Sequence, residues 1–167
     1  MQETLSFLRA LQVNNNRDWF HAHIDTYRRV DQHWKAFVSE LLYEVQQFDP
    51  SMADLTLNDC IYRIYRDVRF SADKSPYKTH LGAFIARGGK KSMHSGYYFH
   101  ISAGDSFGIN GHLLNTGTYC YSTKVLNILR EDLSDDWEAF KRDIIDVADP
   151  HFAPMMLDSL KRVPNGY

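Results

Sequence analysis

The sequence has few cysteines and no long apolar run, and both absences narrow the class of protein. Only Cys60 and Cys120 occur among 167 residues, far apart and outside any CxxC pair. This argues against a disulfide-rich secreted domain and favours two reduced thiols. No segment approaches the roughly 18 apolar residues of a membrane span, and residues 1–13 lack the apolar run of a signal peptide. We therefore expect a cytoplasmic protein with no membrane partner.

The sequence also lacks several motifs that mark known chemistry. It contains no HExxH or CxxC spacing and no GxSxG elbow. The segment 88–92 (GGKKS) is similar to a phosphate-binding loop, but lysine follows Lys90 and the first glycine of that motif would fall on Phe84. We therefore predict no bound metal and no cofactor, and we expect this segment to be a hairpin tip.

Charge is nearly balanced over the whole chain but unevenly distributed along it. The net charge is −2, yet residues 61–91 hold eight basic and two acidic residues, a net of +6. The remainder holds 11 basic and 19 acidic residues, a net of −8. A basic centre in an acidic surrounding can attract an anionic ligand. The alternative is that the basic side chains pair with neighbouring carboxylates.

Apolar spacing predicts helices at both ends of the chain. Spacings of three and four recur over residues 5–27 and over 25–48, and they return after residue 122. The predicted N-caps are Asn14–Asn16, Ser122 and Ser134, and Asp49-Pro50 is predicted to end the second of these helices. A last short helix is expected over 152–160.

The middle of the chain changes to a period of two. Four strands are expected over residues 60–70, 79–86, 96–102 and 106–110. Short links rich in turn residues join the last three, so these neighbours should be antiparallel. We therefore predict that residues 1–167 form one α+β domain. Its antiparallel meander sheet has about four or more strands, packed against the N-terminal and C-terminal helices.

Alternation along these strands separates an apolar face from a polar one. The residues predicted to face the core are Tyr62, Ile64, Val68, Leu81, Ala83, Ile85, Tyr97, Phe99, Ile101, Phe107 and Ile109. The opposite face collects Arg63, Tyr65, Asp67, His80, Tyr98, His100 and Asn110. Arg66 falls on the inward face, where it requires either backbone carbonyls or a buried carboxylate such as Glu40, Glu44 or Asp59.

Four segments form an unusual combination of motifs. They are Asn15–Phe20 (NNRDWF), Tyr62–Ser71 (YRIYRDVRFS), Asp73–His80 (DKSPYKTH) and Gly96–His100 (GYYFH). Together they resemble the DUF2461 family of bacteria and fungi, and the similarity runs from about Leu5 to the end. The family has a signature without an established function, so the resemblance implies a fold and a shared surface rather than a reaction.

The sequence departs from that family in two places. Relatives usually continue well beyond residues 162–166, so we expect the domain to lack a C-terminal segment. In addition, the loop Gly117–Ser122 has no proline where the family pattern has one.

The polar face and the basic centre together supply the candidate site residues. Guanidinium and ammonium groups bind phosphate and carboxylate, and a hydroxyl can add a hydrogen bond. The predicted ligand-binding residues are therefore Arg63, Arg66, Arg69, Lys74, Lys78 and Tyr98. Histidine titrates near neutral pH and aspartate can act as a base, so Asp67, His80 and His100 are the predicted catalytic residues.

Three functions fit these residues. The favoured interpretation is a binding domain or enzyme for a phosphorylated or otherwise anionic small molecule. The second is a non-enzymatic module for nucleic acid or a protein partner, which would also use Arg87, Lys90 and Lys91. The third is a structural protein whose basic centre is neutralised internally. Complete pairing of the arginines with carboxylates would favour the third.

Overall fold

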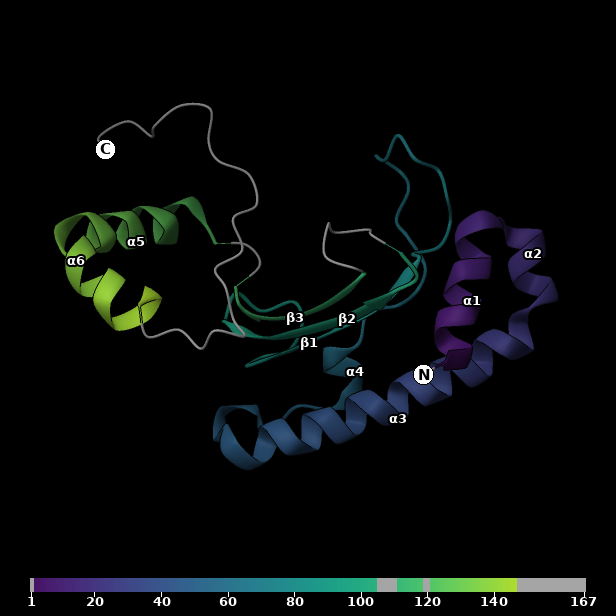
Figure 1. Cartoon of the computed structure of the whole chain (residues 1–167), viewed down its shortest axis with the longest axis horizontal. Helices are drawn as coiled ribbons and strands as arrows, with labels where there is room; N and C mark the ends of the chain where they lie inside the picture. The colour runs from purple at the N-terminus through teal and green to yellow at the C-terminus, as the bar shows by residue number, and fades with distance from the viewer. Residues whose placement is uncertain (1, 105–110, 119–120, 147–167) are drawn as a thin grey trace. The chain divides into compact units, whose positions relative to one another are not determined.

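The computed structural model describes residues 2–104, 111–118 and 121–146 of the chain (Figure 1). The chain forms two compact units, residues 1–119 and 120–167. No helix in the described ranges is both long and apolar enough to cross a membrane.

The first unit begins with three helices, as the apolar spacing predicts. They are α1 (Gln2–Val13), α2 (Arg17–Ala22) and α3 (Ile24–Phe48). Asn16 is the N-cap of α2, because its Oδ1 accepts a hydrogen bond of 2.9 Å from the amide of Trp19. After Asp49, the chain forms a 3₁₀ turn, η1 (Pro50–Met52), and the short helix α4 (Leu57–Cys60).

A three-stranded sheet follows these helices. Its strands are β1 (His80–Ala86), β2 (Gly96–Ser102) and β3 (His112–Gly117), all antiparallel to their neighbours in the order β1-β2-β3. The strands predicted over 79–86 and 96–102 are thereby confirmed. The predicted strand over residues 106–110 lies outside the described residues, and the sequence analysis did not anticipate β3.

The prediction of a strand over residues 60–70 is wrong. Cys60 ends α4, and only Ile61 and Tyr65 form isolated bridges, to Ala83 and Tyr77. Ile61 packs against the core and Ile64 is buried within it. These two inward residues are three positions apart, so the period of two is broken between them. In the described part of the chain, the sheet therefore has three strands rather than four.

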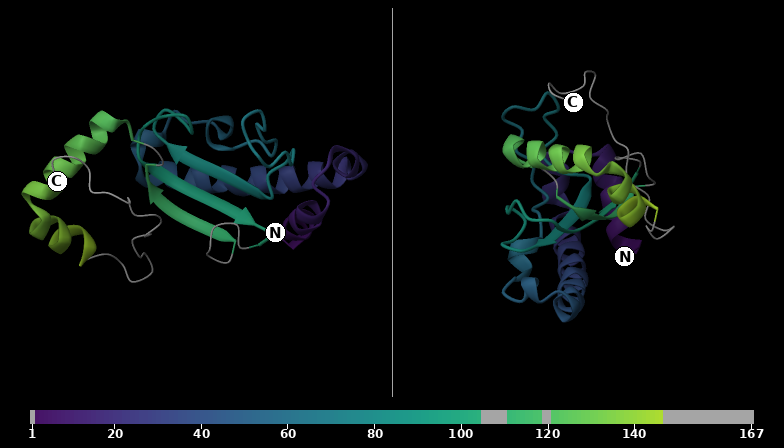
Figure 2. Two further views of the ribbon diagram at one scale, coloured as in Figure 1. Left: turned by 90° about the horizontal axis from the view of Figure 1, so that it is seen from above. Right: turned by 90° about the vertical axis from the view of Figure 1, so that its left-hand side faces the viewer.

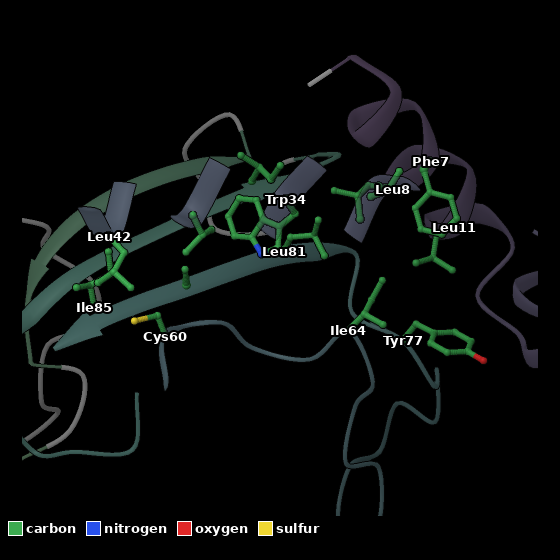
Figure 3. Packing of buried hydrophobic residues seen from close by; sticks show 14 of the residues in the cluster. Phe7, Leu8, Leu11, Trp34, Leu42, Cys60, Ile64, Tyr77, Leu81 and Ile85 are labelled. Carbon is green, nitrogen blue, oxygen red and sulfur yellow. The ribbon is translucent and has the colours of Figure 1, made fainter. Parts of the chain in front are cut away.

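The core lies between α3 and one face of the sheet (Figures 2 and 3). Trp34 and Leu42 of α3 face Leu81 and Ile85 of β1, and all four side chains are buried. Burying each such side chain contributes about 1.5–3 kcal/mol. The predicted inward residues of β1 and β2 all belong to this cluster or pack against it. Their alternates consequently point to the opposite face.

The second unit contains α5 (Thr123–Asp135), α6 (Trp137–Phe140) and a π-helical turn, η2 (Lys141–Ile145). Ser122 caps α5 as predicted, by accepting a hydrogen bond from the amide of Val125. Ser134 does not begin a helix. Asp136 caps α6 instead, because its carboxylate accepts a 3.1 Å hydrogen bond from the amide of Ala139. The helix predicted over 152–160 lies outside the described residues, and packing of the C-terminal helices on the sheet stays a prediction.

A loop over residues 61–79 connects α4 to β1 and projects near α1 and α2 (Figure 1). Its base is held by Asn15, whose Nδ2 donates to the carbonyl of Tyr77 at 2.9 Å. The Oδ1 of the same side chain accepts from the amide of Tyr77 at 3.1 Å. Phe20 stacks on the Tyr77 ring, with 3.9 Å between the ring centroids. The Asn15–Phe20 motif therefore anchors the loop as well as capping α2.

We predict that Asn15→Ala lowers the free energy of unfolding by about 1–3 kcal/mol, because it removes both partners of the Tyr77 backbone at a buried residue. Urea unfolding at pH 7 measures this change. The matched control is Asn58→Ala, at an exposed position of α4, which should change stability by less than about 0.5 kcal/mol. Equal losses in the two variants would show that the hydrogen bonds of Asn15 to Tyr77 do not stabilise the fold.

Candidate functional site

Five side chains gather on the sheet face opposite α3, around Gly82 of β1. They are Tyr62, Lys78, His80, Tyr98 and His100, and we refer to them as the Gly82 cluster. Leu81 and Ala83 face the core, so Gly82 faces away from it. The register pairs Gly82 with His100, which places that imidazole on the same face.

Contacts link the members of the cluster to one another. The Tyr98 hydroxyl lies 3.2 Å from Nδ1 of His100, within hydrogen-bond distance. The rings of His80 and His100 stack with 5.0 Å between their centroids. A Cβ at Gly82 would lie 3.2 Å from the Tyr98 hydroxyl and 3.6 Å from Cδ2 of Tyr62. The two tyrosines approach this closely because residue 82 has no side chain.

Lys78 places a positive charge at the margin of this cluster. Its Nζ lies 5.3 Å from the centroid of the Tyr62 ring, a cation–π contact. The side chain is half-buried, and burial lowers the pKa of its ammonium group, assisted by the charge of Arg63. Within the described residues, neither Lys78 nor Arg63 forms a salt bridge. The charge that acts on the Lys78 ammonium is therefore a like charge, that of Arg63.

Burial favours the neutral form of both histidines in the cluster. Burial lowers the pKa of His80 to about 4, and the charges of His100 and Lys78 add to the effect. Burial also lowers the pKa of His100, partly offset by a hydrogen bond with the backbone of Gly111. A neutral imidazole has one N–H donor and one acceptor nitrogen. His80 can therefore bind a polar ligand or accept a proton, whereas His100 is fully buried and contacts His80 and Tyr98.

Two predicted ligand-binding residues of the loop are engaged within the loop itself. Arg66 forms an ion pair with Asp73 and donates to the carbonyl of Ser75 at 3.2 Å. Arg66 was predicted to lie on the core face of a strand, which is wrong because residues 60–70 do not continue as a strand. Its predicted helix carboxylates are not its partners, but the alternative of a backbone carbonyl is met at Ser75. Lys74 donates from Nζ to the carbonyl of Val68 at 3.0 Å.

Asp67 and Arg69 form a second local pair in this loop. The guanidinium donates to both carboxylate oxygens, at 2.9 and 2.6 Å. This pairing lowers the pKa of Asp67 to about 2. The Asp67 carboxylate thus stabilises the loop conformation, and the structure places it with Arg69 rather than in the Gly82 cluster. Arg66 and Arg69 are therefore each paired with a carboxylate inside the loop.

Other reactive groups in the described ranges are not arranged for catalysis or metal binding. Cys60 is buried, and burial raises the pKa of its thiol to about 11, which disfavours the nucleophilic thiolate. Cys120 lies outside the described residues. No group of three His, Cys, Asp or Glu side chains in the described ranges is placed to hold a metal ion.

A family model described as "Conserved hypothetical protein (DUF2461)" matches residues 3–167. The chain belongs to the DUF2461 family. No curated protein and no solved structure matches it significantly. The family assignment therefore brings no ligand or reaction with it, and the chemistry of this DUF2461 protein must be inferred from its own side chains.

The resemblance motifs fall on the elements that build this region. The loop carries Lys78, β1 begins at His80 and β2 carries Tyr98 and His100. Sequence reasoning missed Gly82 and placed Tyr62 inward. A glycine inside an otherwise apolar strand often marks a close approach of another group, so this signal was present at residue 82. Tyr62 was misplaced because the alternation stops after Ile61.

We predict that the free energy of unfolding falls between pH 7 and pH 5, partly through His80. Its pKa of about 4 in the folded protein lies below the value of about 6.5 for histidine in an unfolded chain. The unfolded chain therefore binds more protons across that window, and stability is lost as the pH falls through it.

Urea unfolding of the wild type and of His80→Gln at both pH values measures this contribution. The loss between pH 7 and pH 5 should be smaller in the variant, and His100 should account for part of what remains. An identical loss in both proteins would show that His80 is not held neutral.

Proposed function

We propose that the Gly82 cluster and Arg63 bind a small anionic molecule, by its phosphate or carboxylate group. The observation that carries this proposal is the position of Lys78. Its ammonium group is half-buried and is affected by the charge of Arg63. Within the described residues neither cation forms a salt bridge, although the charge of Arg63 also acts on the Asp67 carboxylate. Two cations held together repel each other, and an anion between them relieves that repulsion.

The neutral groups of the cluster complement these two cations. His80 and Tyr98 supply imidazole and hydroxyl groups that can hydrogen-bond to anion oxygens, while the fully buried His100 contacts both of them. Charge-assisted hydrogen bonds from lysine and arginine are roughly twice as strong as neutral ones. Partial burial lowers the local dielectric constant and strengthens each of these interactions. The proposed anion site therefore consists of Arg63, Lys78, His80 and Tyr98, with His100 in contact with the last two. It leaves out the residues that are paired within the loop.

One observation favours a second candidate, binding of single-stranded nucleic acid at the tip of the loop. Phe70 is 96% exposed, and the Arg69 guanidinium lies 5.8 Å from its ring centroid. Exposed aromatic rings beside cations can stack on bases. Such binding would use a different part of the chain, and it would weaken steeply as salt is added.

We predict that phosphate, sulfate or a small phosphorylated metabolite raises the unfolding midpoint at both low and moderate salt. A ligand present at 100 times its Kd stabilises the fold by about 2.7 kcal/mol. A thermal-shift series of such anions, carboxylates and short oligonucleotides measures the effect. Lys78→Met should abolish the shift while leaving the unliganded fold at least as stable, because it removes a repelled, half-buried charge.

The matched control is Arg69→Ala, which removes an exposed cation whose partner is Asp67. This variant should keep the full response to small anions. An anion shift that survives Lys78→Met would overturn the proposal. A shift with oligonucleotides alone, lost in Arg69→Ala or Phe70→Ala and steeply dependent on salt, would favour the loop tip instead.

A further inference from the structure

β3 lies at an edge of the sheet (Figure 2), and no other described segment covers it there. It pairs with β2 on one side, and within the described ranges no bridge or backbone hydrogen bond joins its other side. The opposite edge, at β1, is covered in its middle. Ile61 forms a bridge with Ala83, and the amide of Tyr62 donates to the carbonyl of Gly82 at 3.0 Å. An open edge such as that of β3 is a template for another strand.

The sequence of β3 lacks the features that usually protect an edge strand. Residues 112–117 (HLLNTG) contain no proline and no Asp, Glu, Lys or Arg. Their register with β2 runs without a bulge from His112 to Gly117. Charged residues, proline and bulges are the devices that keep edge strands from pairing with another chain. The outer side of β3 is therefore open to pairing along its whole length.

One face of β3 also leaves an apolar side chain uncovered. Leu114 lies opposite Phe99 of β2. The Phe99 ring is stacked near Trp34 and Phe37 of α3, with 5.9 and 5.1 Å between ring centroids. Because opposite residues of an antiparallel pair share a face, Leu114 points to the side of the sheet that α3 covers. Its side chain nevertheless stays 54% exposed, so the helix layer ends before this strand.

We propose that β3 pairs with β3 of a second copy of this chain, antiparallel and across a twofold axis beside Leu114. On the α3 side, β3 presents His112, Leu114 and Thr116, an order of polar, apolar and polar. This order is the same in both directions, so the strand is complementary to itself, as a twofold interface requires. Leu114 then lies opposite Leu114 of the second copy, and each His112 lies opposite a Thr116. The two exposed leucines bury each other.

The pairing keeps the two faces of the sheet separate. A twofold axis perpendicular to an antiparallel sheet leaves equivalent faces on the same side. The α3 helices of both copies therefore cover one face, and both Gly82 clusters lie on the other. Neither cluster takes part in the interface, so dimerisation does not depend on the proposed anion binding, and either proposal can fail without the other.

The length of β3 predicts a reversible association. Its six residues span about 20 Å, so the paired edges bury less than the roughly 1,200 Å² of a standard interface. Backbone hydrogen bonds along one strand and a single leucine pair support a weak dimer. We expect a dissociation constant between about 1 µM and 1 mM.

Sedimentation equilibrium of the intact chain at pH 7, over that range of concentration, measures the association. Leu114→Lys should weaken it by at least about tenfold, because two ammonium groups would face each other in the dimer. The same side chain is exposed in the single chain, so the fold should tolerate the change, which circular dichroism checks. The matched control is Val13→Lys, at an exposed apolar residue of α1, and it should leave the dissociation constant unchanged.

Opposite charges test which residues face each other. Leu114→Glu should weaken the dimer as Leu114→Lys does, because two carboxylates would then meet. An equal mixture of the two variants places lysine opposite glutamate and should restore dimerisation. A mixture that stays as monomeric as each variant alone would overturn the pairing of residue 114 with itself.

Cysteine cross-linking tests the register without introducing a charge. Directly opposite residues have Cβ atoms about 4.5–5.5 Å apart, and diagonal neighbours about 7–8 Å, which is too far for a disulfide. In a Cys120→Ser background, with Cys60 buried, Leu114→Cys should therefore form covalent dimers on oxidation. Asn115→Cys is the matched control, because residue 115 would lie opposite Leu113 of the second copy. It should give far fewer covalent dimers.

Three results would overturn the proposal. One is a wild-type chain that stays monomeric up to about 1 mM. Another is a dimer that Leu114→Lys leaves unchanged, since the interface would then lie elsewhere on the chain. The third is equal cross-linking of Leu114→Cys and Asn115→Cys, which would show random collision rather than a fixed register.

Discussion

The packing of α3 against one face of the sheet determines which side chains of this protein are available for chemistry. Trp34, Val38 and Leu42 bury the inward side chains of β1 and β2. Because successive residues in a strand point to opposite faces, this single contact directs His80, Tyr98 and His100 to the other face. A shift of one residue in register would exchange the two sets and place the imidazoles in the core. The large apolar burial under α3 therefore also fixes the polar cluster.

The basic centre separates into two parts with different physical roles. In the projecting loop, Asp67 and Asp73 hold Arg69 and Arg66, and these exposed pairs shape the loop while contributing little stability. On the sheet face, Lys78 and Arg63 are not paired in this way among the described residues, and burial acts on Lys78 and His80. A guanidinium group that already pairs with a carboxylate binds an added anion weakly. A partly desolvated cation that lies near a like charge binds an anion more favourably. The proposed site therefore contains only part of the basic segment.

Much of the fold was predictable because it depends on local pattern. Each of these patterns can be recognised from a few neighbouring residues. They are the spacing of apolar residues along α1 and α3, the caps at Asn16 and Ser122, and the alternation in β1 and β2. The errors occurred where a contact distant in sequence overrides local pattern. Residues 60–70 alternate as a strand does, but the loop is closed by Asn15 and Phe20, more than 40 residues earlier in the chain. For the same reason, Tyr62 and Arg66 were assigned to the wrong face.

The sequence by itself determined the family, the α+β class, the core faces of two strands and the presence of a basic segment that contains His80. These follow from residue types and short-range spacing. Only the tertiary structure decided which charges are neutralised and which are not. Pairing depends on distances between side chains from separate segments, and burial depends on everything packed around them. The arrangement of Lys78, Tyr62 and His80 around a bare Gly82 is such a property, since it arises from the docking of the loop beside β1 and β2.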